Sequence, residues 1–143
     1  MRMLPHPEDG ASVAGAEART ALSSPLLEIS NATVRVYKAA FGRGPTHARA
    51  RFAGPDTLVV LLQDTMTVSE RKLAELGEYE RVRAHRLLLH QVVEDEIRAV
   101  VEEVLERPTL SLIGGLDPER DVAAEVIMLA PVTQLEPGSI PPV

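Results

Sequence analysis

Apolar positions along residues 26–130 follow a helical spacing first, then an alternating one, and then repeat that order. Over residues 26–41 they recur every three or four positions, which predicts a helix. Gly42 comes directly after this segment and suits a left-handed helix end. The predicted inward face of the helix consists of Leu27, Ser30, Val34, Tyr37 and Phe41.

Two segments after this helix predict a β-hairpin. Residues 46–53 alternate in character, and Gly54-Pro55-Asp56 supplies a turn. Residues 58–62 are all aliphatic, which is typical of a strand at the centre of a sheet. In the first strand, Ala48, Ala50 and Phe52 are expected on one face and His47, Arg49 and Arg51 on the other.

A capping box begins the second half of the core. Thr67, followed three residues later by Glu70, predicts a short helix over 68–76. A long helix is expected over 78–107, where Pro108 ends it, and strands over 109–113 and 122–129, with a loop at 114–118. The apolar stripe of the long helix consists of Tyr79, Val82, Leu89, Val93, Ile97, Val100 and Val104, and Leu110 and Leu112 are expected to point inward from the next strand.

The order helix, strand, strand, helix, strand, strand predicts an α+β fold. We expect a two-layer sandwich with a four-stranded antiparallel sheet and one long helix, formed by a single domain over 26–130. Residues 1–25 are rich in Pro, Gly, Ala and Ser and predict a disordered arm with at most a weak helix. Residues 131–143 contain four Pro and predict a disordered tail.

Composition excludes several classes of function. The 143 residues include no Cys, which rules out disulfides, thiol catalysis and Cys-ligated zinc. A net charge of −6 with only 3% aromatic residues disfavours binding to nucleic acid. The longest uninterrupted aliphatic run has five residues, so no membrane insertion is expected, and a secretory signal is not evident. A cytoplasmic location is therefore expected.

Charge is unevenly distributed, and this predicts a binding site. No acid occurs between Glu28 and Asp56, whereas residues 94–106 are strongly acidic. Arginine forks suit planar anions and phosphates, so a site for a small anion is a hypothesis for this basic segment. A solvated strand face is the alternative interpretation. The candidate ligand-binding residues are Arg43, His47, Arg49 and Arg51.

The long helix predicts a homodimer. Thirty helical residues extend about 45 Å, which exceeds the diameter of about 33 Å expected for such a domain. Leu87, Leu88 and Val92 lie off its main apolar stripe and are the candidate interface residues. The alternatives are a break near His85 and Arg86 that folds the helix back, or a disordered acidic end of the helix.

No set of residues predicts catalysis. The sequence has neither a G-x-S-x-G nor an HExxH motif, and its four His are dispersed. No catalytic residue, metal site or cofactor is therefore expected. Arg83 and Arg86 are expected to pair with Glu80 or Glu94, or else with the acids of a partner.

The order of these motifs resembles the MpsC-like family of small bacterial proteins over residues 28–130. The resemblance rests on the helix that begins at Ile29 and ends in Phe41-Gly42-Arg43-Gly44-Pro45, and on the motifs that follow it. These are the aliphatic strand, the Thr67 capping box, Val82-Arg83 with Arg86, Asp117-Pro118 and Glu125-Val126. The family was long described as a domain of unknown function, and its name refers to a Na⁺-translocating, membrane-potential-generating system.

The resemblance implies a non-enzymatic accessory or regulatory module of a membrane ion or inorganic-carbon transport system. A membrane transport protein is then the expected partner, and it would bring this chain to the membrane. The alternative hypothesis is a regulator that binds a small anion or a nucleotide through the basic strand face.

Overall fold

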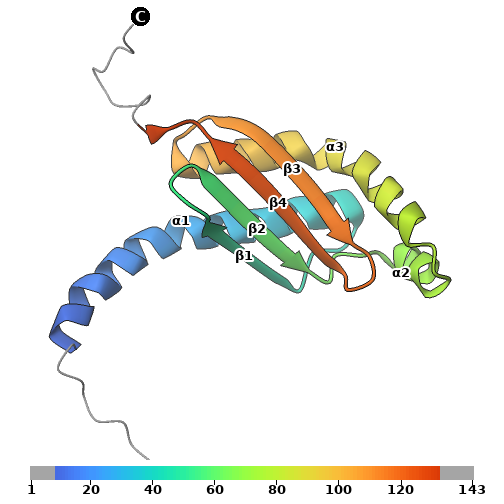
Figure 1. Ribbon diagram of the computed structural model, residues 1–143, viewed down its shortest axis with the longest axis horizontal. Coiled ribbons are helices and arrows are strands. Elements are labelled where there is room, and N and C mark those ends of the chain that lie inside the picture. The colour runs from blue at the N-terminus through green and yellow to red at the C-terminus, as the bar shows by residue number, and fades with distance from the viewer. Residues whose placement is uncertain (1–8, 133–143) are drawn as a thin grey trace, which may run out of the picture.

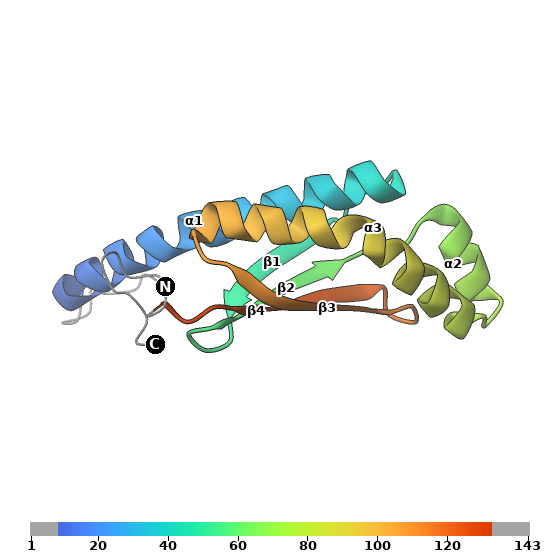
Figure 2. The same cartoon turned by 90° about the horizontal axis from the view of Figure 1, so that it is seen from above.

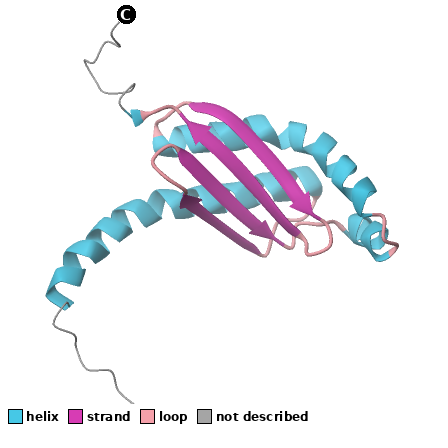
Figure 3. Cartoon of the chain, viewed as in Figure 1, coloured by secondary structure: helices cyan, strands magenta, loops and turns pink. Residues whose placement is uncertain are grey.

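The computed structural model describes residues 9–132, with side chains from residue 25 onward. Two helices lie side by side on one face of a four-stranded sheet, and a short helix lies at one end of it (Figures 1 and 3). The predicted α+β sandwich with an antiparallel sheet is confirmed. The elements are α1 (Asp9–Phe41), β1 (His47–Phe52), β2 (Thr57–Gln63), α2 (Val68–Glu75), α3 (Tyr79–Leu105), β3 (Thr109–Asp117) and β4 (Val122–Leu129).

The sheet has the order β1-β2-β4-β3, and all neighbouring strands are antiparallel. β2 lies in the interior of the sheet, as its aliphatic run predicts. The registers align Ala50 of β1, Val60 of β2 and Glu125 of β4 across the sheet. All three are buried beneath the helices. Figure 2 shows both long helices above the sheet, and no described element covers its other face.

α1 begins earlier than the sequence predicts, and its buried face coincides with the predicted one only in part, at Ser30 and Tyr37. It starts at Asp9 rather than near residue 26 and continues through Pro25, which lacks the N–H of a helical hydrogen bond. Leu27 was expected inside but is 60% exposed, because the buried face is centred on Ile29 and Val36. The expected left-handed helix end is confirmed, since Gly42 has a φ of +77°.

The predicted separation into arm, domain and tail stays a prediction. Residues 1–8 and 133–143 lie outside the described residues. Residues 9–25, assigned at most a weak helix from the sequence, are helical in the structure. Figure 1 shows this part of α1 extending beyond the sheet.

α3 is continuous, so the expected alternative of a break near His85 is wrong. It ends at Leu105, where Glu106 adopts a left-handed conformation with a φ of 54°. Figure 2 shows that α3 bends, with its C-terminal half over the sheet and its N-terminal half beside α2. Its buried positions include two that the predicted apolar stripe does not contain, Arg86 and Val101; the others are Val82, Val93 and Ile97.

The loop predicted at 114–118 is wrong, because β3 continues through two glycines to Asp117. Gly114 and Gly115 pair with Glu125 and Ala124 of β4. The prediction that Leu110 points inward is also wrong: it is exposed, because a bulge between Thr109 and Ser111 interrupts the alternation. Leu112 packs against the core as expected.

Candidate functional site

Three of the four predicted anion-binding residues lie together on β1. His47, Arg49 and Arg51 are all exposed and alternate with Ala48 and Ala50, which face the helices. They therefore lie on the sheet face opposite α1 and α3. Charged side chains on this uncovered edge are arranged as the sequence predicts, whereas binding of an anion stays a prediction.

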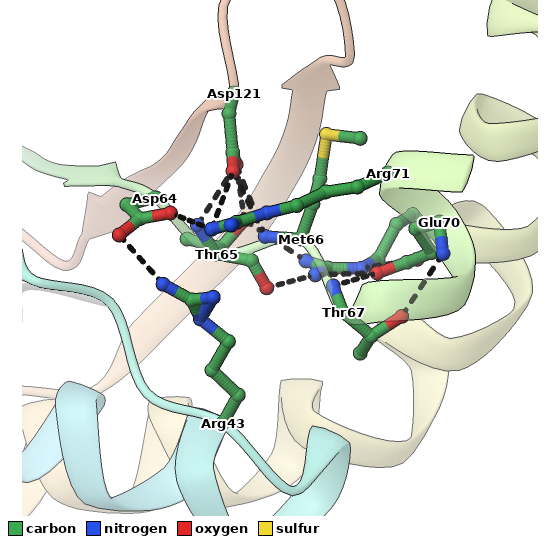
Figure 4. Close-up of polar contacts among 9 residues, drawn as sticks. Arg43, Asp64, Thr65, Met66, Thr67, Glu70, Arg71 and Asp121 are labelled. Carbon is green, nitrogen blue, oxygen red and sulfur yellow. Dashed lines mark hydrogen bonds and ion pairs between the residues drawn. The ribbon is translucent and has the colours of Figure 1, made fainter. Parts of the chain in front are cut away.

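Arg43 does not belong to this row. It lies in the loop after α1, and its guanidinium contacts a carboxylate oxygen of Asp64 at 2.6 Å. Asp64, with a left-handed φ of 63°, also pairs with Arg71 of α2. Figure 4 shows Arg43 and Arg71 on the two sides of Asp64. Arg43 thus connects the loop after α1 to the residue that follows β2, and its charge is already paired with that of an acid.

The face of the sheet that carries His47, Arg49 and Arg51 is apolar at its centre, and we call it the open face. By register, a row from Arg51 crosses Val59 and Val126 to Ile113, and a parallel row from Arg49 crosses Leu61 to Ala124. Ile113 is 66% exposed, Met128 48% and Leu61 38%. The open face consists of His47, Arg49, Arg51, Thr57, Val59, Leu61, Gln63, Ser111, Ile113, Gly115, Asp117, Val122, Ala124, Val126 and Met128.

Apolar residues on both faces of β2 and β4 distinguish this sheet from an ordinary two-layer one. An antiparallel sheet with one solvated face usually alternates apolar and polar residues. Here Val59 and Val126 are outward neighbours of the buried Leu58 and Ile127. Aliphatic side chains gathered on an uncovered face are characteristic of an interaction surface.

A network of partly buried ionic and polar groups fixes the end of the sheet next to α2. A carboxylate oxygen of Asp121 accepts hydrogen bonds from the backbone N–H groups of Thr65 and Met66 at 2.8 and 3.1 Å (Figure 4). Thr67 caps α2 in the predicted capping box with Glu70. These contacts satisfy backbone donors at the β2–α2 junction.

Glu70 and Arg86 form a buried ion pair between α2 and α3. The Arg86 Nε atom lies 2.8 Å from Glu70, and its guanidinium also donates to Thr65 and lies 4.4 Å from the centre of the Phe41 ring. Burial opposes ionisation of Glu70, but the hydrogen bonds from Arg86 and from the Thr67 backbone outweigh it and hold the pKa of Glu70 below its usual range. Arg86 therefore pairs within the chain, although with Glu70 rather than Glu80 or Glu94.

A second buried cluster joins α1, α3 and β4. Glu125 is fully buried; one of its carboxylate oxygens accepts a hydrogen bond from the Tyr37 hydroxyl, and the other contacts His90 Nε2, both at 2.6 Å. The hydrogen bond to Glu125 raises the pKa of His90 despite partial burial. Burial, reinforced by the carboxylate of Glu125, raises the pKa of Tyr37. The cluster can thus hold a proton on His90 and keep Tyr37 neutral.

Sequence analysis missed His90, and it included Glu125 only as part of a family motif. One signal was present, since Glu125 is the only charged residue within the apolar strand Val122–Leu129. An acid at an inward position of a central strand needs partners from the layer above it. Finding those partners requires the packing of α1 and α3.

The predicted interface residues Leu87, Leu88 and Val92 are exposed on α3. Arg83, which was expected to pair with Glu80 or Glu94, pairs with Glu80. Among the side chains that the structure describes, from residue 25 to residue 132, no group of three or more His, Asp or Glu could hold a metal ion.

Together, the fold and the open face define a small α+β domain whose antiparallel sheet is covered by helices on one side only. The chain belongs to the MpsC family, which is described as the Na⁺-translocating membrane potential-generating system (MpsC) and whose model matches residues 26–131. The resemblance inferred from the sequence is thereby confirmed. No curated protein and no solved structure matches the chain.

Proposed function

We propose that the protein is a non-enzymatic accessory module that binds a protein component of the membrane ion or inorganic-carbon transport system and regulates it. The family description suggests an association with a membrane system that generates a Na⁺ potential. None of the helices within residues 9–132 is long and apolar enough to cross a membrane. Binding to a membrane-embedded partner from the cytoplasmic side accounts for both findings.

The observation that carries this proposal is the open face of the sheet. Its aliphatic centre favours a partner with an apolar surface, and the row of His47, Arg49 and Arg51 along one edge favours acidic side chains opposite. We infer an acidic segment of the partner with apolar residues between its charges. Such a segment would cover Val59, Val126 and Ile113 and pair with the basic edge.

Affinity capture from native cells tests this interface. Tagged protein is incubated with detergent-solubilised membranes, and bound proteins are identified by mass spectrometry. The wild type should retain a polytopic transport protein, and Ile113→Glu or the double variant R49E/R51E should bind it about tenfold more weakly, because each places negative charge on the open face.

The matched control is the double variant R35E/K38E, which reverses two exposed charges on α1. It changes net charge by as much as R49E/R51E but leaves the open face intact, so it should bind like the wild type. Recovery of no membrane protein would overturn the proposal. Equal recovery with wild-type, open-face and control variants would overturn it as well.

The anion-binding alternative depends on His47, Arg49 and Arg51 alone, because Arg43 is paired with Asp64. Calorimetric titration with phosphate, bicarbonate and nucleotides distinguishes it from binding of a protein. Heat of binding that disappears in R49E/R51E would favour this alternative, whereas no heat with any of these anions would exclude them as ligands.

A further inference from the structure

On the helix side of the sheet, a cavity of about 560 Å³ lies beside the Tyr37–Glu125–His90 cluster. It is bounded by the C-terminal end of α1, the N-terminal half of α3, and the adjoining parts of β3 and β4. This is the region where α3 bends away from the sheet (Figure 2). The volume falls within the range of about 300–1,000 Å³ that is typical of small-molecule sites.

Most of the cavity wall is apolar. Phe41, Leu87 and Leu116 contribute large side chains, and Ala84 and Ala123 leave room between them. Phe41 also packs edge to face against Tyr37, with ring centres 5.2 Å apart. A compact molecule with an aromatic or branched apolar body suits such a wall.

The charged groups that line the cavity are mainly cationic. Arg83, Arg86 and His90 are lining residues, and the only lining acid is Glu80, whose side chain is 84% exposed. Arg86 is already neutralised by Glu70. Arg83 pairs only with Glu80 among the described residues, and an exposed pair of this kind contributes little to stability. Arg83 can therefore exchange its partner for the anionic group of a ligand.

His90 is held in a position from which it can contact the anionic group of a ligand. Its Nε2 atom contacts Glu125, and its Nδ1 atom has no hydrogen-bond partner among the described residues. The imidazole reaches Glu125 only because residue 114 is a glycine: a Cβ there would lie 2.6 Å from the Glu125 carboxylate and closer still to His90 Nε2. Such a close approach is what a glycine within a strand permits.

We propose that this cavity binds a small, mainly apolar molecule that carries a single anionic group. The apolar body lies between Phe41, Leu87 and Leu116, and the anionic group contacts Arg83 and the Nδ1 side of His90. The site lies on the face of the sheet opposite the open face, so it is independent of the proposed partner surface. A protein of this design binds both a partner and a small ligand.

The test uses two fluorescent probes that differ in charge. 8-Anilinonaphthalene-1-sulfonate is an aromatic monoanion, and N-phenyl-1-naphthylamine is the same skeleton without the sulfonate. The wild-type protein should bind the sulfonate saturably at one site and the neutral probe about tenfold more weakly, as expected for the loss of a charge-assisted contact.

Variants locate the bound probe. Arg83→Gln should weaken binding of the sulfonate about tenfold and leave the neutral probe unaffected, because it removes only a charge. Ala84→Phe should prevent binding of both probes by filling the cavity, and Ala84 is exposed on α3, so the fold tolerates the change. The matched control is Arg81→Gln, on the same helix, which loses an equivalent pair with Glu78 outside the cavity.

Retention of saturable binding in Ala84→Phe would place the probe elsewhere, for example on the open face, and would overturn the proposal. Equal affinity for the charged and neutral probes would overturn the assignment of an anionic ligand, as would equal losses in Arg81→Gln and Arg83→Gln. Absence of saturable binding to the wild type would overturn the site itself. Circular dichroism of each variant checks that its fold is unchanged.

Discussion

Gly114 is required by a contact that only the folded chain makes. It lies in β3 beside His90 and Glu125, and no larger residue leaves room for the two side chains to meet. Gly115, the next residue, has open space where a Cβ would lie. Of these two adjacent glycines, only Gly114 is therefore required by a close contact.

Replacing Gly114 by Ala should lower the free energy of unfolding by about 1–3 kcal/mol, because the new methyl group forces His90 and Glu125 apart. Gly115→Ala is the control and should change stability by less than about 0.5 kcal/mol. Urea denaturation measures both. Equal losses in the two variants would show that the contact between His90 and Glu125 contributes nothing.

The stability contributed by His90 should depend on pH. In the folded protein the pKa of His90 is raised above its usual value by the hydrogen bond to Glu125, which faces it from β4, and Glu94 of α3 adds to the effect. The neutral Tyr37 of α1 is bound to the same carboxylate. A raised pKa gives a contribution that is fully present below the unfolded value and is lost as the pH rises through the folded one.

The stability difference between wild type and His90→Gln should therefore be larger near pH 6 than near pH 9. Glutamine keeps a donor for Glu125 but cannot become charged. Urea denaturation of both proteins over this pH range measures the difference. A difference that is constant, or that grows toward pH 9, would contradict the assignment of the proton to His90.

Among the elements, α2 is the one whose first residue is best specified by its own sequence. Thr67 accepts from the backbone of Glu70, and the Glu70 side chain accepts from the backbone of Thr67 at 2.8 Å. The same Glu70 carboxylate binds Arg86 of α3. The capping box thus fixes both the start of α2 and the position of an acid that binds the next helix.

Thr67→Ala should destabilise the protein by about 1 kcal/mol, the usual cost of a lost N-cap. Lys72→Ala is the control on the same helix, because the pair of Lys72 with Glu75 is exposed and contributes little. Thermal denaturation followed by circular dichroism compares the two. A loss in Thr67→Ala no larger than that in Lys72→Ala would mean that the cap is dispensable.

Local patterns were enough to predict most elements. The aliphatic run of β2, the capping box of α2 and the glycine after α1 each depend on neighbours within a few residues along the chain, and all are confirmed. Contacts between distant segments were not predictable in this way. Gly114 and Gly115 were assigned to a loop, because the contact that explains Gly114 within a strand is with His90, on another element.

At the candidate site, too, local patterns predicted the strand but not the contacts between distant segments. Alternation alone placed His47, Arg49 and Arg51 on one face, as the structure has them. Arg43 was grouped with them by proximity in sequence, but it binds Asp64, 21 residues further on. Likewise, the partner of the buried Arg86 lies 16 residues earlier in the chain, on a different helix.

At the scale of the whole molecule, the side chains described from residue 25 to residue 132 leave two apolar regions of the sandwich uncovered, the open face of the sheet and the outer side of α3. On α3, Leu88 and Val92 are separated by one helical turn and are 67% and 60% exposed. The predicted homodimer would bury this pair, and it stays a prediction. Leu87, the third predicted interface residue, also lines the cavity.

Light scattering after size-exclusion chromatography should give the mass of a dimer for the wild type and of a monomer for the double variant L88E/V92E, because two carboxylates cannot be buried unpaired in a symmetric interface. Leu76→Glu, another exposed leucine, is the control and should remain dimeric. A monomeric wild type would refute this interface.

The burial of Glu125 bears on how the chain selects its fold among near alternatives. β4 carries aliphatic residues on both faces, so hydrophobicity alone does not decide which face turns toward the helices. A slip of one residue would bring Val126 or Ala124 under Tyr37 and leave its hydroxyl without the Glu125 acceptor, at a cost of about 1–3 kcal/mol. The single charged residue of the strand thus sets its orientation, and Glu125→Leu would leave two alternative pairings of β4 close in energy.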